Sequence, residues 1–125
     1  MNGVLLVAAG GALGAVARYG MGLLGVRLFG ADFPWGTLAV NVIGGVAMGA
    51  VFALWGDKRA LTLLLATGVL GGFTTFSSYA LEVVRMMQRG AIPIAIAYAL
   101  GSVALACLGI VLGMALGTSI ARSVA

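Results

Sequence analysis

Four long apolar stretches, separated by short polar or charged turns, make up most of this chain; they cover about residues 3–29, 36–55, 60–88 and 91–121. Each stretch is at least as long as the roughly 20 helical residues that cross the hydrocarbon core of a bilayer. Polar and apolar residues do not alternate with period 2, and a membrane barrel needs at least about eight strands. The pattern therefore predicts an all-α membrane protein, with one domain of four transmembrane helices over residues 1–125.

The third stretch is interrupted near its middle by the polar segment Gly71–Tyr79, GGFTTFSSY. Glycine lets the backbone leave helical geometry, and freed carbonyl groups at this depth are tolerated only where they meet protein, water or an ion. Broken helices at the membrane midplane form ion sites in many transport proteins. We therefore expect the third helix to be broken here, although packing alone explains any one of these residues.

Composition supports a membrane protein and argues against an enzyme. Hydrophobic residues make up 62% of the chain and charged residues 8%, whereas a soluble domain carries roughly 25% charged residues. There is no His, one Cys, and three carboxylates in separate segments, Asp32, Asp57 and Glu82, which argues against imidazole, disulfide and paired-carboxylate chemistry. The scattered basic residues suit lipid headgroups better than nucleic acid.

The basic residues give no clear orientation in the membrane. An even number of spans places both termini on one side. Three basic residues fall on that side and three on the other: Lys58, Arg59 and Arg122 against Arg27, Arg85 and Arg89. Orientation follows an excess of Lys and Arg on cytoplasmic loops, so we predict insertion in both directions and an antiparallel dimer.

Glycines recur every fourth residue in three of the stretches: Gly10 and Gly14; Gly45 and Gly49; Gly109, Gly113 and Gly117. Residues four apart share a helix face, and small residues let helix backbones approach closely in lipid. These faces are expected to pack helices together, and also to support oligomerisation.

Polar side chains inside the spans are the candidate functional residues, because burying them without partners is costly. Arg18 either reaches the interface or lines an aqueous vestibule. Asn41 offers two amide donors, with an interhelical hydrogen bond as the alternative. Phe76 and Tyr79 share a helix face, and the positive edges of their rings favour an anion. Ser102 adds a hydroxyl from the fourth span.

Three segments carry a family resemblance: Gly10–Tyr19 (GGALGAVARY), Gly36–Gly44 (GTLAVNVIG) and Gly71–Tyr79. Together they resemble the signature segments of the Fluc (CrcB) fluoride channels, in order and over nearly the whole chain. The resemblance implies an antiparallel dimer with two pores in a bacterial inner membrane. It also implies export of fluoride from the cytoplasm, which lowers its toxicity, and a central structural sodium ion.

The resemblance also implies roles for individual residues. Asn41 resembles the pore asparagine and Phe76 the first of two pore phenylalanines, while Arg18 resembles the arginine near a vestibule. The carbonyl groups of Gly71 and Thr74, with those of a second subunit, resemble the sodium ligands. The expected hydroxyl track consists of Thr75, Ser78 and Ser102.

One position departs from the family pattern, because Tyr79 stands where the second pore phenylalanine usually lies. Its added hydroxyl could bind fluoride too tightly, block the path or leave conduction intact. This departure leaves two alternatives for the dimer. It is either a homodimer or a heterodimer with a related subunit that supplies the phenylalanine.

Two rival functions fit a short four-helix chain. A proton-coupled cation exporter of the small multidrug resistance type needs a carboxylate in the first span, where this chain has only Arg18, and Glu82 lies late in the third. A membrane assembly subunit without transport needs packing glycines but not the polar break.

Overall fold

The computed structural model describes residues 2–124 and contains no strand within that range. Four helical spans are long and apolar enough to cross a membrane, which confirms the expected all-α membrane architecture. They are α1 (Gly3–Phe29), α2 (Trp35–Trp55), a composite third span (Arg59–Gln88) and α6 (Ile92–Val124). The last helix continues beyond the expected end near Ala121 because no Gly or Pro follows Gly117.

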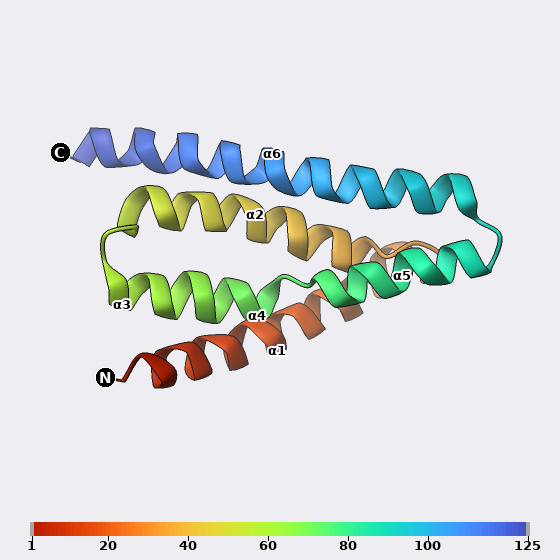
Figure 1. The fold of residues 1–125 in the computed structure, drawn as a ribbon, viewed down its shortest axis with the longest axis horizontal. Coiled ribbons are helices and arrows are strands. Elements are labelled where there is room, and N and C mark those ends of the chain that lie inside the picture. Colours follow the sequence, from red (N-terminus) through yellow and green to blue (C-terminus); the bar gives the residue numbers. More distant parts are fainter. Residues whose placement is uncertain (1, 125) are drawn as a thin grey trace.

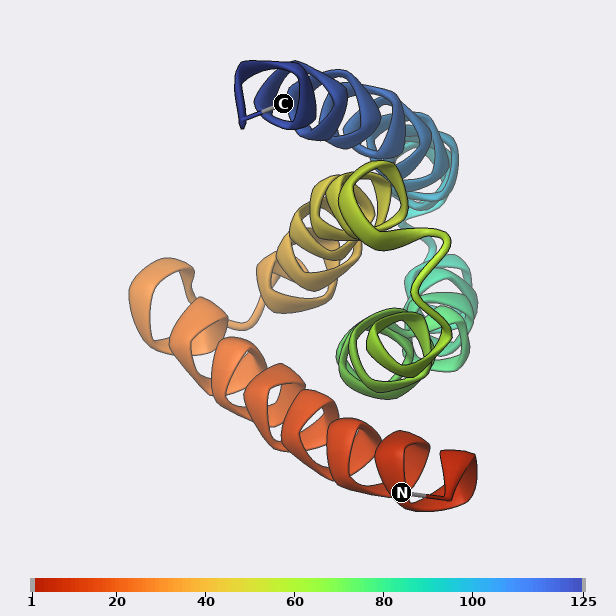
Figure 2. The same cartoon turned by 90° about the vertical axis from the view of Figure 1, so that its left-hand side faces the viewer.

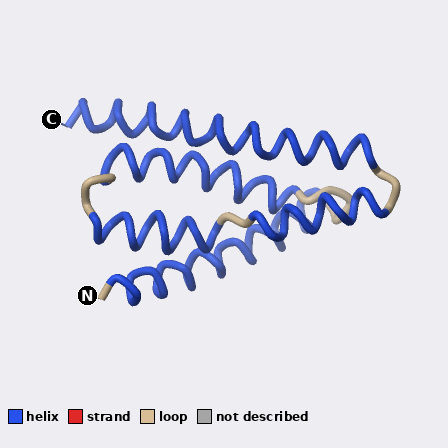
Figure 3. The backbone as a smooth tube through the Cα atoms, in the orientation of Figure 1, coloured by secondary structure: helices blue, strands red, loops and turns tan. Residues whose placement is uncertain are grey.

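The third span is assembled from several short elements: α3 (Arg59–Leu61), the π-helical η1 (Thr62–Leu70), α4 (Gly71–Phe73) and α5 (Phe76–Gln88). Between α4 and α5 the chain is extended, with ψ of 158° at Thr74 and 123° at Thr75. Figure 3 shows this gap as a short loop inside the span. The helix is thus interrupted inside the polar segment where the sequence predicts a break.

The helices lie side by side with both termini at the same end of the molecule (Figure 1). Viewed from that end, they form an open arc, with α1 at one edge and α6 at the other (Figure 2). α2 packs mainly on α6, and α1 packs mainly on η1, with further contacts to α2 and α4. The break therefore directly follows the part of the third span that packs on α1, and it faces the α2–α6 pair through Asn41 of α2.

The repeated glycines form the contacts between α2 and α6 and those between α1 and η1. A Cβ atom on Gly49 or Gly113 would overlap backbone atoms across the α2–α6 contact, and one on Gly14 would overlap Val69 in η1. This confirms that these glycines pack helices closely. The neighbours that these glycines meet all belong to the same chain.

We expect Gly113→Ala to destabilise the protein, because the added methyl group would force α6 away from Val46 of α2. Overpacking of this kind costs about 1–3 kcal/mol, which thermal unfolding in detergent would detect. Gly101→Ala on the same helix is the matched control, since a Cβ there meets nothing within 4 Å. Equal stability of the two variants would contradict this account of the glycine faces.

Candidate functional site

Asn41 holds the backbone at the break through two hydrogen bonds. Its Nδ2 donates to the Thr75 carbonyl at 3.0 Å, and its Oδ1 accepts from the Thr75 N–H at 2.8 Å. A backbone group without a partner in the hydrocarbon region costs several kcal/mol. The Asn41 amide thus satisfies both polar groups of a residue that has left the helix, and retains one N–H for a further partner.

Two other carbonyl groups next to the break also have partners. The Leu70 carbonyl accepts from both the N–H and the hydroxyl of Thr74, at 3.0 and 2.9 Å. The Gly72 carbonyl accepts from Nε of Arg18 at 3.0 Å. Arg18 therefore binds the broken helix directly and does not simply extend to the membrane surface.

The carbonyl groups of Gly71 and Thr74 lose the donors that a continuous helix would give them. In a continuous helix these donors would be the N–H groups of Thr75 and Ser78. The Thr75 N–H instead donates to Asn41, and the Ser78 N–H donates to Oγ1 of Thr75 at 3.2 Å. Both carbonyl oxygens therefore keep capacity for another ligand, which fits the chemistry of a hard cation.

A groove with a volume of about 380 Å³ lies beside the break, between α2, α5 and α6. Its lining includes five of the six predicted pore residues: Asn41, Thr75, Phe76, Tyr79 and Ser102. The remaining one, Ser78, lines a different cavity. No charged side chain lines the groove within residues 2–124.

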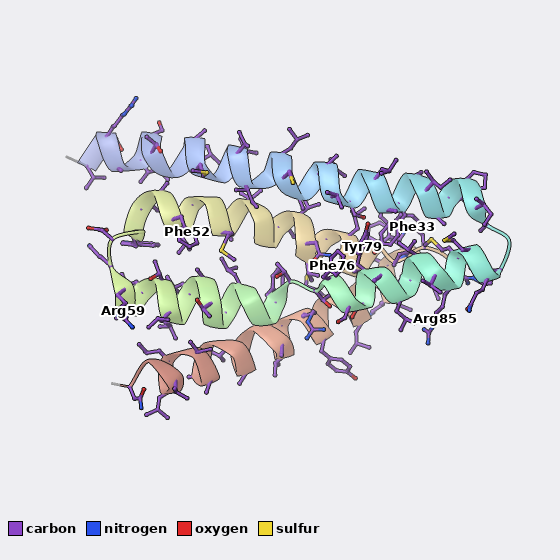
Figure 4. The ribbon with its side chains drawn as sticks, viewed as in Figure 1. Phe33, Phe52, Arg59, Phe76, Tyr79 and Arg85 are labelled. Carbon is purple, nitrogen blue, oxygen red and sulfur yellow. The ribbon has the colours of Figure 1, made fainter. Side chains whose placement is uncertain are left out.

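The aromatic and hydroxyl side chains in this groove differ in how freely they can meet a ligand. Phe76 is 76% exposed, and its ring centroid lies 5.4 Å from that of Tyr79. Figure 4 shows both rings near the break. The Tyr79 hydroxyl donates to the Ala99 carbonyl at 2.7 Å. Ser102 is only 4% exposed, and its hydroxyl has no hydrogen-bond partner within the described residues.

A larger cavity, called the vestibule below, has a volume of about 890 Å³. Its charged lining residues are Arg18, Asp32, Glu82, Arg85 and Arg89. Three arginines against two carboxylates leave an excess of positive charge. Thr75 lines both the vestibule and the groove, so the break lies between a charged and an uncharged space.

A hydrogen-bonded group centred on Glu82 was not predicted from the sequence. Thr37 donates to Oε1 of Glu82 at 2.6 Å, and the Tyr98 hydroxyl donates to Oε2 at 2.7 Å. This group joins α2, α5 and α6. The sequence does contain a signal for this group. Thr37 lies four residues before Asn41, and Tyr98 lies four residues before Ser102, so each shares a helix face with a predicted pore residue.

Comparison with known proteins supports the resemblance drawn from the three segments. Residues 5–114 match the family model described as "CrcB-like protein, Camphor Resistance (CrcB)". The chain is 43% identical to a protein of Agrobacterium fabrum over 124 residues, covering 96% of this chain and 99% of that protein. It is 47% identical to one of Novosphingobium aromaticivorans over 131 residues, covering all of both chains.

A third relative, from Phenylobacterium zucineum, is 50% identical over 121 residues, with 93% of this chain and 95% of that protein covered. All three relatives carry the name "Fluoride-specific ion channel FluC". The family is one of ion channels, which confirms the expectation that this protein is not an enzyme.

We expect Asn41→Ala to lower the stability of the folded chain, because both backbone groups of Thr75 lose their partner. Leaving two such groups unpaired costs about 2–6 kcal/mol. Denaturant titration in detergent would measure the change. Gln88→Ala, which removes an exposed amide at the end of α5, is the control; an equally small effect of both changes would argue against the pairing.

Proposed function

Because this chain belongs to the CrcB family, we propose that it is a fluoride-selective ion channel through which fluoride leaves the cell. The observation that carries the proposal is the groove, where Asn41, Phe76, Tyr79 and Ser102 meet beside a break in a membrane-spanning helix. The names of the relatives supply the identity of the ion.

The chemistry of the groove suits a small anion that must not be trapped. Moving an isolated ion out of water into an apolar medium costs on the order of tens of kcal/mol. The remaining N–H of Asn41, the hydroxyl of Ser102 and the ring edge of Phe76 can replace part of the lost hydration. The groove has no Lys or Arg lining, so release remains possible, as conduction requires.

The vestibule suits the capture of anions ahead of the groove. Clefts lined with an excess of one charge raise the local concentration of counter-ions. Arg18, Arg85 and Arg89 supply that charge, and Thr75 connects the two spaces. Fluoride would thus pass from a charged entrance to an uncharged binding path.

The functional unit is proposed to be an antiparallel homodimer in a bacterial inner membrane. The equal numbers of basic residues at the two ends support insertion in both directions. The Gly71 and Thr74 carbonyl groups, together with those of the second copy, would hold a structural sodium ion. Its charge would make the surrounding potential more favourable for anions.

A proton-coupled cation exporter is less well supported. Its carboxylate would need to exchange protons and bind a cation from an accessible cavity. Glu82 lies on the vestibule, but Thr37 and Tyr98 donate to its two oxygens, and arginines line the same cavity. A non-transporting assembly subunit would not account for the buried Ser102 hydroxyl that has no hydrogen-bond partner among the described residues.

Liposomes that contain only this purified chain should lose fluoride rapidly and chloride negligibly, as read by ion-selective electrodes. Phe76→Ala should lower the fluoride rate by roughly tenfold, because a ring-edge contact contributes about 0.5–1.5 kcal/mol. Phe52→Ala is the matched control, since Phe52 is 52% exposed on α2 and lies outside the groove. An unchanged fluoride rate in Phe76→Ala would show that the Phe76 ring takes no part in conduction.

Topology tags at the C-terminus should report both sides of the membrane in comparable amounts, because the charge count favours neither orientation. Adding two lysines after Arg122 should shift most copies to one orientation and reduce assembly of the antiparallel dimer. Nearly complete one-sided labelling of the unmodified chain would contradict dual insertion.

A further inference from the structure

The hydroxyl of Tyr79 borders the groove, but its proton is already committed to a hydrogen bond with α6. Its hydroxyl donates to the Ala99 carbonyl of α6 at 2.7 Å, an ordinary length for a good O–H···O hydrogen bond. A phenol has a single proton to donate. While this bond holds, the Tyr79 hydroxyl cannot also donate to an anion in the groove.

The ring of Tyr79 is held from a second direction by aromatic neighbours. Its centroid lies 5.5 Å from that of Tyr98 and 5.4 Å from that of Phe76. Tyr98 is only 3% exposed, and Glu82 fixes its hydroxyl. Tyr79 therefore connects the buried ring of Tyr98 to the exposed ring of Phe76, and Figure 4 shows Phe76 and Tyr79 next to each other near the break.

The position of Tyr79 along the chain gives this bond more than local importance. Tyr79 lies in the first turn of α5, immediately after the two extended residues of the break. A continuous helix would hold this turn through backbone bonds to the preceding turn. Here the hydroxyl of Tyr79 joins the start of α5 to α6. Helix α6 is itself held in place by its close glycine contacts with α2.

We propose that Tyr79 is a positioning residue whose hydroxyl anchors the start of α5 to α6, while its ring edge borders the groove. The inference rests on the proposed channel function. It also implies that a homodimer needs no related subunit with phenylalanine at this position.

The test compares Tyr79→Phe, which removes only the hydroxyl, with Tyr79→Leu, which removes the ring, in the full chain. Tyr19→Phe is the control, because Tyr19 is 70% exposed on α1. We expect Tyr79→Phe to lower the melting temperature in detergent by about 2–4 °C. It should also speed amide exchange in the first turn of α5, and Tyr19→Phe should do neither.

Fluoride efflux from liposomes separates anchoring from ion binding. In Tyr79→Phe the maximal rate should fall by about two- to fivefold, while the half-saturating fluoride concentration stays within about twofold, because no ion ligand is lost. Tyr79→Leu should lower the maximal rate by more than about tenfold. The rates are compared per folded channel, so a loss of folded protein alone would leave the maximal rate unchanged.

Two results would overturn the proposal. Unchanged melting and amide exchange in Tyr79→Phe would mean that the hydroxyl anchors nothing. A rise of threefold or more in half-saturating fluoride without destabilisation would make the hydroxyl an ion ligand. Absence of fluoride efflux from the unmodified chain would instead refute the channel function. The melting temperature and amide exchange of Tyr79→Phe would still show whether the Tyr79 hydroxyl anchors α5 to α6.

Discussion

The pairing between the Asn41 amide and the backbone of Thr75 is the interaction on which the site depends. A helix cannot be broken in an apolar medium unless the freed N–H and C=O groups find partners. A side chain from α2, 34 residues away in sequence, supplies both partners for Thr75. Without it, the energetic preference for backbone bonding would favour a continuous third helix, and Phe76 and Ser78 would lie elsewhere.

Close helix packing places the groups that stabilise the break. Glycine contacts fix α2 against α6, so Asn41 and Ser102 reach the same groove from a rigid pair of helices. On the other side, α1 approaches so closely that a Cβ on Gly72 would overlap the Gly11 carbonyl. The same approach brings Arg18 within hydrogen-bonding distance of the Gly72 carbonyl.

Local sequence features predicted the spans and the broken segment because both depend on neighbouring residues: a sustained apolar run, and glycines followed by hydroxyl residues. The partners across the break were not predictable in this way. Ser78 and Ser102 look alike as membrane hydroxyls, yet helix rotation directs one to the vestibule and the other to the groove. The bond from Tyr79 to Ala99 likewise depends on how α5 resumes after the break.

The division into a charged vestibule and an uncharged groove follows from where the break lies. The vestibule is large and polar enough to hold Arg18 beside the break, whereas the groove is bordered by uncharged side chains: rings, an amide, hydroxyls and aliphatic groups. A cation inside the groove would bind an anion strongly and slow its release. Because the arginines lie in the vestibule and not in the groove, their long-range attraction can concentrate anions near the break. The dipoles of the groove can then coordinate an anion at short range. Thr75 lines both spaces, so it marks the point where long-range attraction by the arginines ends and short-range coordination in the groove begins. Asn41 fixes the Thr75 backbone, and the Thr75 hydroxyl donates to that of Ser78.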